Sequence, residues 1–220
     1  MSIIIKLLTK YGYIYVQGLG GTLWLSVVTV GIASILGTLV SILKMSRIKI
    51  FQFSVNVYID IIRGTPLLLQ IYFFWLILPK MMPIRMSDTT CIVVALIVNS
   101  TAYVAEIVRA GIQAVDLGQR EAAMSLGMSH RNMMIRIILP QAIKNILPAI
   151  GNEFIAILKE TSMASIFFVM ELTTAYKTVQ NATYKYIPSL LISGVIYFTL
   201  TFTLTRLLGI FERKLKSNDR

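Results

Sequence analysis

Residues Thr22–Leu43 read TLWLSVVTVGIASILGTLVSIL, an apolar run that contains no charged side chain. The hydrocarbon core of a bilayer is about 30 Å thick, and a helix needs about 20 residues to cross it. Ala33, Gly37 and Ser41 recur in this run at four-residue spacing, a pattern that lets two helix backbones approach closely within a membrane. The stretch therefore predicts a membrane-spanning helix that packs against another helix.

The rest of the chain has the same apolar character. Of its 220 residues, 56% are hydrophobic and only 14% are charged, and the mean hydropathy is +0.74, whereas about 25% of residues are charged in an average soluble protein. We predict an all-α integral membrane protein with one transmembrane domain, residues 1–220, and five spans at about 22–43, 55–79, 88–112, 139–160 and 187–209. The first 15 residues lack the features of a secretory signal and are predicted to form a short amphipathic segment at the outer surface.

The net charge of +11 follows a pattern of membrane topology. Lys and Arg gather in alternate segments, namely after the first predicted span, between the third and the fourth, and at the C-terminus. Because cytoplasmic segments carry an excess of Lys and Arg, these three segments are expected in the cytoplasm. The N-terminus is then outside and the C-terminus inside, and the basic excess does not indicate nucleic-acid binding.

The sequence offers little for catalysis or metal binding. Cys91 is the only cysteine and His130 the only histidine, which excludes multi-cysteine and paired-histidine metal sites. The chain also lacks the G-x-x-x-x-G-K-[ST] loop that holds nucleotide phosphates. We therefore expect a non-catalytic subunit that holds no cofactor of its own.

The second predicted span is interrupted. Residues 58–66 read YIDIIRGTP and place the charges of Asp60 and Arg63 beside Gly64 and Pro66. Proline disfavours helical geometry at the preceding residue, and irregular backbone at membrane depth persists only where it lines a cavity or is buried in protein. Broken helices often mark the substrate site of a transporter. Since no internal repeat is visible, a second subunit is expected to complete the pathway about a two-fold axis.

Two further acids lie in the fourth predicted span. Glu153 and Glu160 are seven residues apart, so a helix places them on one face about 10 Å from each other. A carboxylate inside a membrane costs roughly 2.5–3.5 kcal/mol on insertion scales, and a nearby cation offsets this cost. We predict a site for a basic amino acid that consists of the acids Glu153, Glu160 and Asp60, the hydrogen-bonding residues Asn56 and Thr65, and Arg63 as counter-ion for the substrate carboxylate.

Two of these acids also have a structural interpretation. Asp60 has Arg63 three residues further on, where a helix brings the two side chains together. Glu160 lies beside Lys159 near the outer end of its span, and both side chains could reach the membrane surface. Glu153 has no basic residue three or four positions away, so it is the strongest candidate.

The other acids of the apolar region are expected to be structural. Glu106 has Arg109 as a helical neighbour at three-residue spacing, which predicts an ion pair. Glu171 falls in the outer connection between the last two spans, where it is expected to be solvated.

The segment at about 113–138 is polar enough to protrude from the membrane. Asp116 with Gln119 three residues later resembles a capping box. Gly127 suits the position that follows a helix, and Ser129 can cap the next one. The spacing predicts two short helices joined by a tight turn, although an ordinary cytosolic loop with two surface helices fits it equally well.

This segment also carries a long motif. Glu121-Ala122-Ala123 is followed after three residues by Gly127 and then by Ile137 and Leu139-Pro140, which resembles the EAA signature of ABC importer permeases. Four other stretches narrow the resemblance to the polar amino-acid family, which includes histidine, arginine and glutamine permeases: RGTPLL at 63–68, AEIVRAG at 105–111, NEF at 152–154 and KETS at 159–162.

The resemblance implies a five-helix permease core in the bacterial cytoplasmic membrane, docked on two copies of a cytoplasmic ABC ATPase that binds ATP and Mg²⁺. A periplasmic or cell-surface binding protein is expected to deliver the amino acid, and a second permease subunit, expected to be identical, completes the pathway. By the same resemblance, the ATPase-docking residues are Glu121, Ala122, Ala123 and Gly127.

Two alternatives to a basic substrate stay open. Uncharged or acidic polar amino acids such as glutamine fit the same family, because the acids could then contact only the α-amino group. A self-sufficient carrier or channel also suits buried acids, but it leaves the EAA segment without a purpose.

Overall fold

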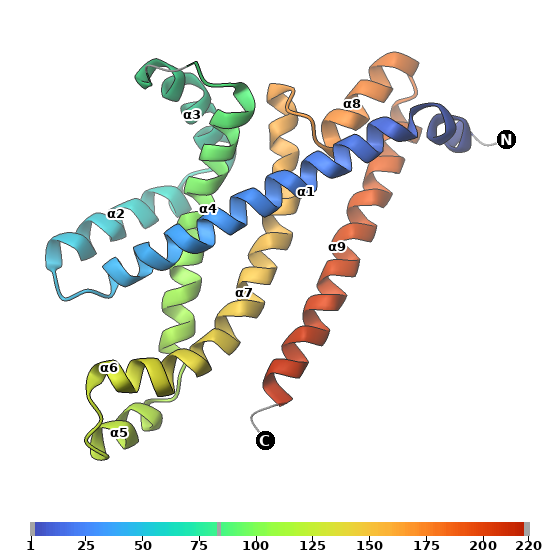
Figure 1. Ribbon diagram of the computed structural model, residues 1–220. Helices are drawn as coiled ribbons and strands as arrows, with labels where there is room; N and C mark the ends of the chain where they lie inside the picture. Colours follow the sequence, from blue (N-terminus) through green and yellow to red (C-terminus); the bar gives the residue numbers. More distant parts are fainter. Residues whose placement is uncertain (1–2, 83–84, 218–220) are drawn as a thin grey trace.

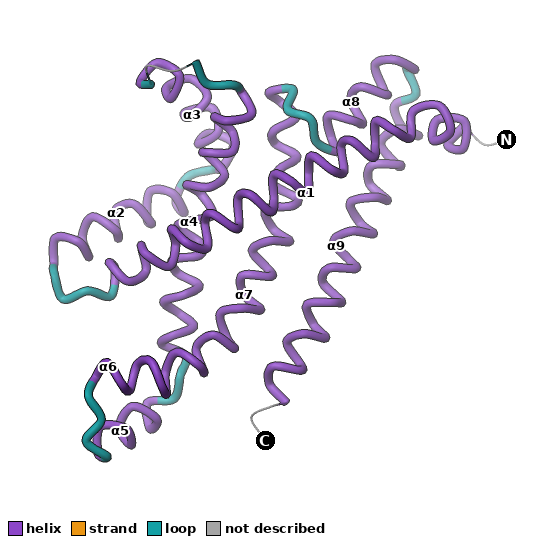
Figure 2. Tube along the Cα trace, in the orientation of Figure 1, coloured by secondary structure: helices purple, strands orange, loops and turns teal. Residues whose placement is uncertain are grey.

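The computed structural model describes residues 3–82 and 85–217, and within these ranges the chain contains helices and loops but no β-strand (Figure 2). The elements are α1 (Ile3–Lys44), α2 (Lys49–Gly64), α3 (Leu67–Met81), α4 (Asp88–Gln113), α5 (Leu117–Ser125), α6 (His130–Met133), η1 (Met134–Ile138), α7 (Leu139–Glu160), η2 (Thr161–Phe167), α8 (Leu172–Thr183) and α9 (Tyr186–Ser217). In Figure 1, α1 runs obliquely across α4, α7 and α9, with α5 and α6 at one end of the molecule and α8 at the other.

The described helices agree with the five predicted spans when α2 and α3 are taken as one broken span. Within residues 3–82 and 85–217, four stretches are long and apolar enough to cross a membrane, namely α1, α4, residues His130–Phe167 and α9. The pair α2 and α3 passes the same test together, with a bend of 110° between the two helices. The predicted interruption is confirmed, because α2 ends at Gly64 and α3 begins at Leu67.

The predicted N-terminal segment is not a short element of its own but the first part of α1, and its location at the outer surface stays a prediction. Helix α1 starts at Ile3 and continues for 42 residues without a break. Its first half packs through Leu7, Ile14 and Tyr15 against α8 and against Ile192 of α9. Most helical stability in proteins comes from such packing, which here outweighs the low helix propensity of the glycines in this half. At 1.5 Å per residue the helix is about 63 Å long, roughly twice the thickness of a bilayer core.

The small-residue stripe of α1 packs against α4, as the sequence predicts. Ala33, Gly37 and Ser41 are all buried. A Cβ atom placed on Gly37 would lie 2.7 Å from the Cβ of Val104 on α4, which is closer than side chains pack. The absence of a side chain at Gly37 thus allows the contact that fixes α4 against α1.

A buried amide holds the bend between α2 and α3. Gln70 Nε2 donates to the Ile62 carbonyl at 2.7 Å and to the Thr65 hydroxyl at 2.9 Å. Gln70 Oε1 in turn accepts a hydrogen bond from Asn99 of α4 at 2.9 Å. The last carbonyls of a helix have no partner within the helix, and Pro66 has no N–H to offer. Gln70 supplies the missing donor and ties the bend to α4.

Glu171 is not solvated, contrary to the sequence-based expectation. Its side chain is fully buried, and its carboxylate accepts from the N–H groups of Thr173 at 2.7 Å and Thr174 at 2.6 Å. The Tyr197 hydroxyl of α9 donates to it at 2.9 Å. Burial raises the pKa of the Glu171 carboxyl, and these hydrogen bonds oppose the shift. Glu171 therefore caps α8 and joins it to α9.

Replacing Glu171 by alanine is expected to destabilise the protein by about 2–3 kcal/mol, because a helix cap is lost and buried donors are left without an acceptor. In detergent, this corresponds to a fall in melting temperature of about 5 °C or more. Glu171→Gln keeps one acceptor oxygen, so its melting temperature should fall by less than that of the alanine variant. An unchanged melting temperature of the alanine variant would show that α8 does not depend on this cap.

Candidate functional site

Glu153 and Glu160 lie on one continuous helix, α7. Glu153 is in the second half of the helix and half-buried, and its Oε1 accepts a hydrogen bond from the Ser100 hydroxyl of α4 at 2.7 Å. Glu160 ends the helix and lines a cavity of about 320 Å³ together with Ala156, Lys159 and Met163. The seven-residue spacing therefore does place both carboxylates on one face of a helix. Ser100 was missed from the sequence, because only the packing of α4 on α7 brings it to Glu153.

The predicted residues of α2 lie on a different side of α4. Asn56 and Asp60 are exposed, and α2 packs through Val55 and Ile59 against Ala102 and Ala105 of α4. Ala102 is two residues from Ser100, which is about 200° around the helix. Within one chain, the six predicted substrate residues therefore form two groups, and α2 and α7 each pack against α4.

Arg63 and Thr65 are engaged within the protein. Arg63 Nη1 lies 3.9 Å from Glu106 Oε2, and its guanidinium lies over the Tyr103 ring at 5.3 Å. Arg63 thus pairs with Glu106 and not with Asp60, its predicted alternative partner. The Thr65 hydroxyl donates to the Ile61 carbonyl at 2.8 Å and accepts from Gln70. Both side chains stabilise the bend of the broken span.

The predicted pair of Glu106 and Arg109 is confirmed. Arg109 Nη2 donates to Glu106 Oε2 at 2.8 Å. Lys44, the last residue of α1, donates to the other carboxylate oxygen. This cluster joins α1, α2 and α4, and it explains how Glu106 is accommodated in a membrane helix.

α5 is the first of the two predicted short helices, whereas the second, α6, is four residues long and continues through η1 into α7. The Asp116 side chain accepts from the Gly118 N–H at 2.7 Å at the start of α5. Gly127 has a φ of 73° and follows that helix, a conformation that favours glycine. Ser129 caps α6.

The four predicted docking residues do not all face outward. Glu121, Ala122 and Gly127 are exposed, as is Leu126, which is 82% exposed. Ala123 is only 4% exposed and packs inside the chain in the cluster that contains Met133. Ala123 therefore anchors α5 to its own chain, and its part in the docking element stays a prediction.

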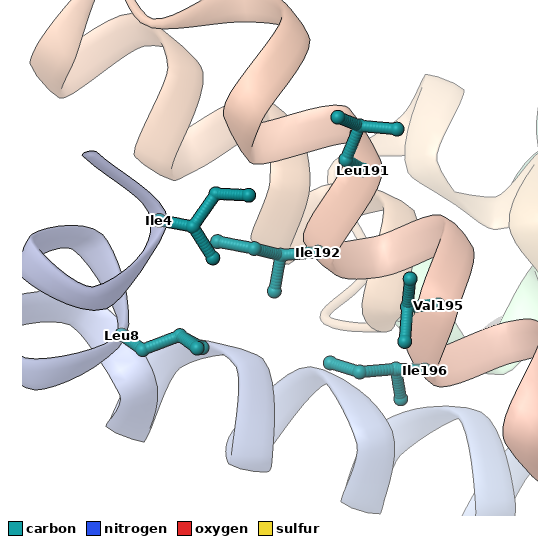
Figure 3. Close-up of a pocket in the computed structure, with 6 residues that line it drawn as sticks. All are labelled: Ile4, Leu8, Leu191, Ile192, Val195 and Ile196. Atoms are coloured by element: carbon teal, nitrogen blue, oxygen red, sulfur yellow. The ribbon is translucent and has the colours of Figure 1, made fainter. Parts of the chain in front are cut away.

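An apolar cavity lies at the other end of the molecule (Figure 3). It has a volume of about 190 Å³, and its lining is aliphatic, with Ile4 and Leu8 from α1 and Leu191, Ile192, Val195 and Ile196 from α9. Because an amino acid carries two charged groups that need polar partners, this lining does not suit it.

Residues 30–217 match the family described as "Binding-protein-dependent transport system inner membrane component". The chain is 42% identical over 203 residues to the "Arginine transport system permease protein ArtQ" of Bacillus subtilis (strain 168), a match that covers 92% of this chain and 93% of that protein. It is 36% identical over 215 residues to the "Putative glutamine transport system permease protein GlnP" of Rickettsia conorii (strain ATCC VR-613 / Malish 7), and 98% of each chain is covered.

Two solved structures of ABC transporters are also similar to this chain. The structure described as "Crystal structure of an amino acid ABC transporter with histidines" superposes with a TM-score of 0.91 at 44% identity, and the match covers 97% of this chain and 100% of that chain. An inward-facing structure of the MetNI methionine ABC transporter gives a TM-score of 0.76 at 16% identity, over 98% of this chain and 99% of that chain. At that identity, the second likeness shows the fold alone.

Proposed function

The chain belongs to the family of binding-protein-dependent transport system inner membrane components and is the permease subunit of an amino-acid ABC importer; on this premise, we propose that its substrates are the basic amino acids arginine, lysine and histidine. The observation that carries the proposal is Glu153, a carboxylate in the second half of the membrane helix α7 with a neutral hydroxyl as its hydrogen-bond partner. A cationic side chain of the substrate would offset the cost of burying this charge.

Glu160 supports the same assignment. Two carboxylates about 10 Å apart repel each other by roughly 1–2 kcal/mol at an effective dielectric constant near 20, and a cation between them makes the interaction favourable. Asn56 and Asp60 lie on the other side of α4, so they would reach this substrate only from a second copy of the chain or after a rearrangement. The proposal rests on α7 and does not need them.

The assembly follows from the family. We propose two copies of a separate ATPase, which hydrolyses ATP, and a binding protein that delivers the substrate. A second permease chain, identical to this one, completes the pathway. The surface that docks on the ATPase lies at the α5–α6 end and includes the exposed residues Glu121, Ala122 and Gly127. The excess of Lys and Arg at that end supports a cytoplasmic location. The start of α1 is then outside and the end of α9 inside (Figure 1).

Glutamine is the second candidate substrate, because several relatives at 34–36% identity are named putative glutamine permeases. The glutamine amide would then contact the Glu153 carboxylate by hydrogen bonds alone.

Binding of labelled arginine to the purified permease–ATPase complex, without the binding protein, separates the two candidates. We expect lysine and histidine to displace labelled arginine, with glutamine at least about tenfold weaker, because a hydrogen bond between two charged groups exceeds a neutral one by about 1–2 kcal/mol. Omitting the binding protein ensures that the permease itself is measured. Displacement by glutamine at the same concentration as by lysine would refute the preference for basic substrates.

A further inference from the structure

One face of α7 carries polar or small side chains along its whole length, whereas Ile143 and Leu147, which are also exposed, lie on the other side of the helix. The residues of the polar face follow one another at spacings of three or four, so that they share one face of the helix: Gln141, Asn145, Ala149, Asn152, Ala156 and Lys159. Asn145, Asn152 and Lys159 are exposed and the others half-buried. Glu153 and Glu160 lie along one edge of this face, each four residues after one of its alanines.

A face of this composition does not suit contact with lipid. Polar side chains at membrane depth are costly unless they face water or other protein groups. The exposed residues of α9 show what a lipid-facing surface of this chain looks like, since they include Leu190, Val195, Phe198 and Phe202. The polar face of α7 is therefore the wall of an aqueous pathway that passes Glu153.

At the α5–α6 end this face opens into a polar cavity of about 360 Å³, which is within the usual size of small-ligand sites. Its polar lining consists of Asp116, Gln119, Gln141, Lys144 and Asn145. Asp116 carries a negative charge and Lys144 a positive one, and the three amides can both donate and accept hydrogen bonds. This set matches the α-ammonium and the α-carboxylate of an amino acid and leaves the substrate side chain unspecified.

We propose that this cavity is a release site, which holds the α-amino and α-carboxylate groups of the transported amino acid before it leaves to the cytoplasm. This proposal rests on the proposed function, which places the substrate at Glu153. The polar face of α7 leads from Glu153 to the cavity. Asp116 binds the ammonium group, and Lys144 binds the carboxylate.

The two walls of the release site belong to different structural elements, α5 and α7. Asp116 and Gln119 belong to the segment that begins α5, whereas Gln141, Lys144 and Asn145 belong to α7. Gln141 Nε2 lies 3.4 Å from Gln119 Oε1 and links the two walls. Movement of α5 against α7 would separate the ammonium partner from the carboxylate partner. Release is thereby coupled to the segment that faces the ATPase.

Site-directed labelling tests the release site in the permease–ATPase complex in lipid nanodiscs without ATP. Cys91, which is buried, is first replaced by alanine, and Asn145→Cys is then labelled with a membrane-impermeant maleimide. We expect labelling without substrate, and a rate about tenfold lower at an arginine concentration near ten times its dissociation constant. Citrulline, which has the same α-groups and a neutral side chain, should protect equally, whereas agmatine, which lacks the carboxylate, should not.

Matched variants give the controls. Asp116→Asn keeps the acceptor that caps α5 but removes the charge, and Lys144→Gln removes the cation; each should abolish protection without changing the rate in the absence of substrate. Ile146→Cys replaces a side chain that is only 8% exposed and should not be labelled.

Three outcomes would overturn the release site: failure of Asn145→Cys to react, absence of protection by any amino acid, or equal protection by arginine and agmatine. Protection by citrulline and glutamine but not by arginine would instead refute the basic-substrate proposal and leave the release site standing.

Discussion

Replacing Glu153 by glutamine is expected to lower arginine uptake by at least about tenfold. Glutamine has nearly the same volume and still accepts the hydrogen bond from Ser100, which lies at 2.7 Å in the native chain, so the fold is retained. The variant loses the charge that attracts the substrate cation. Such an ionic hydrogen bond contributes about 1.5–3 kcal/mol, and each 1.4 kcal/mol changes affinity about tenfold.

Uptake of labelled arginine into proteoliposomes measures this effect, with the binding protein outside and ATP inside. Asp60→Asn is the matched control, because it also neutralises one carboxylate but lies on the α2 side of α4. We expect this control to transport arginine at close to the native rate. Native uptake by the Glu153 variant would refute the cationic site on α7, and an equal loss in both variants would bring α2 into the substrate site.

Replacing Ala122 by arginine is expected to uncouple transport from ATP hydrolysis. Ala122 is exposed on α5 beside the buried Ala123, so a long charged side chain there does not disturb the chain's own core. It would instead prevent the close approach of a partner surface. Stimulation of ATPase activity by the loaded binding protein should fall by at least about tenfold, since small-to-large changes in packed contacts cost about 1–3 kcal/mol.

The controls for this variant separate docking from folding. Ala122→Ser keeps a small side chain and should remain coupled, and the amount of arginine variant in the membrane should equal that of the native chain. Deletion of Glu121–Gly127 is the stronger test of the mechanism. If uptake continued after the deletion, the protein would be a self-sufficient carrier and not an ATP-driven permease.

Many of the helix bounds of this protein can be predicted from local sequence. Apolar length determines the membrane helices, and this is why the bounds of α4 agree with the prediction within one residue. Gly64 and Pro66 determine the break between α2 and α3, because their backbone restrictions act within a few residues. Asp116 and Ser129 determine the starts of α5 and α6 for the same reason. The EAA stretch identifies the family.

Contacts between distant segments were decided by the tertiary structure alone. The sequence predicts that Glu171 is a solvated loop residue. In the folded chain, however, α9 places the Tyr197 hydroxyl 2.9 Å from its carboxylate. The burial of Ala123 also depends on the tertiary structure, because Met133 and its neighbours cover this side chain of α5. Arg63 has an acid three residues away in sequence, but Glu106 of α4 becomes its partner. Sequence spacing gives the face of a helix on which a side chain lies, whereas its partner depends on which helix packs against that face.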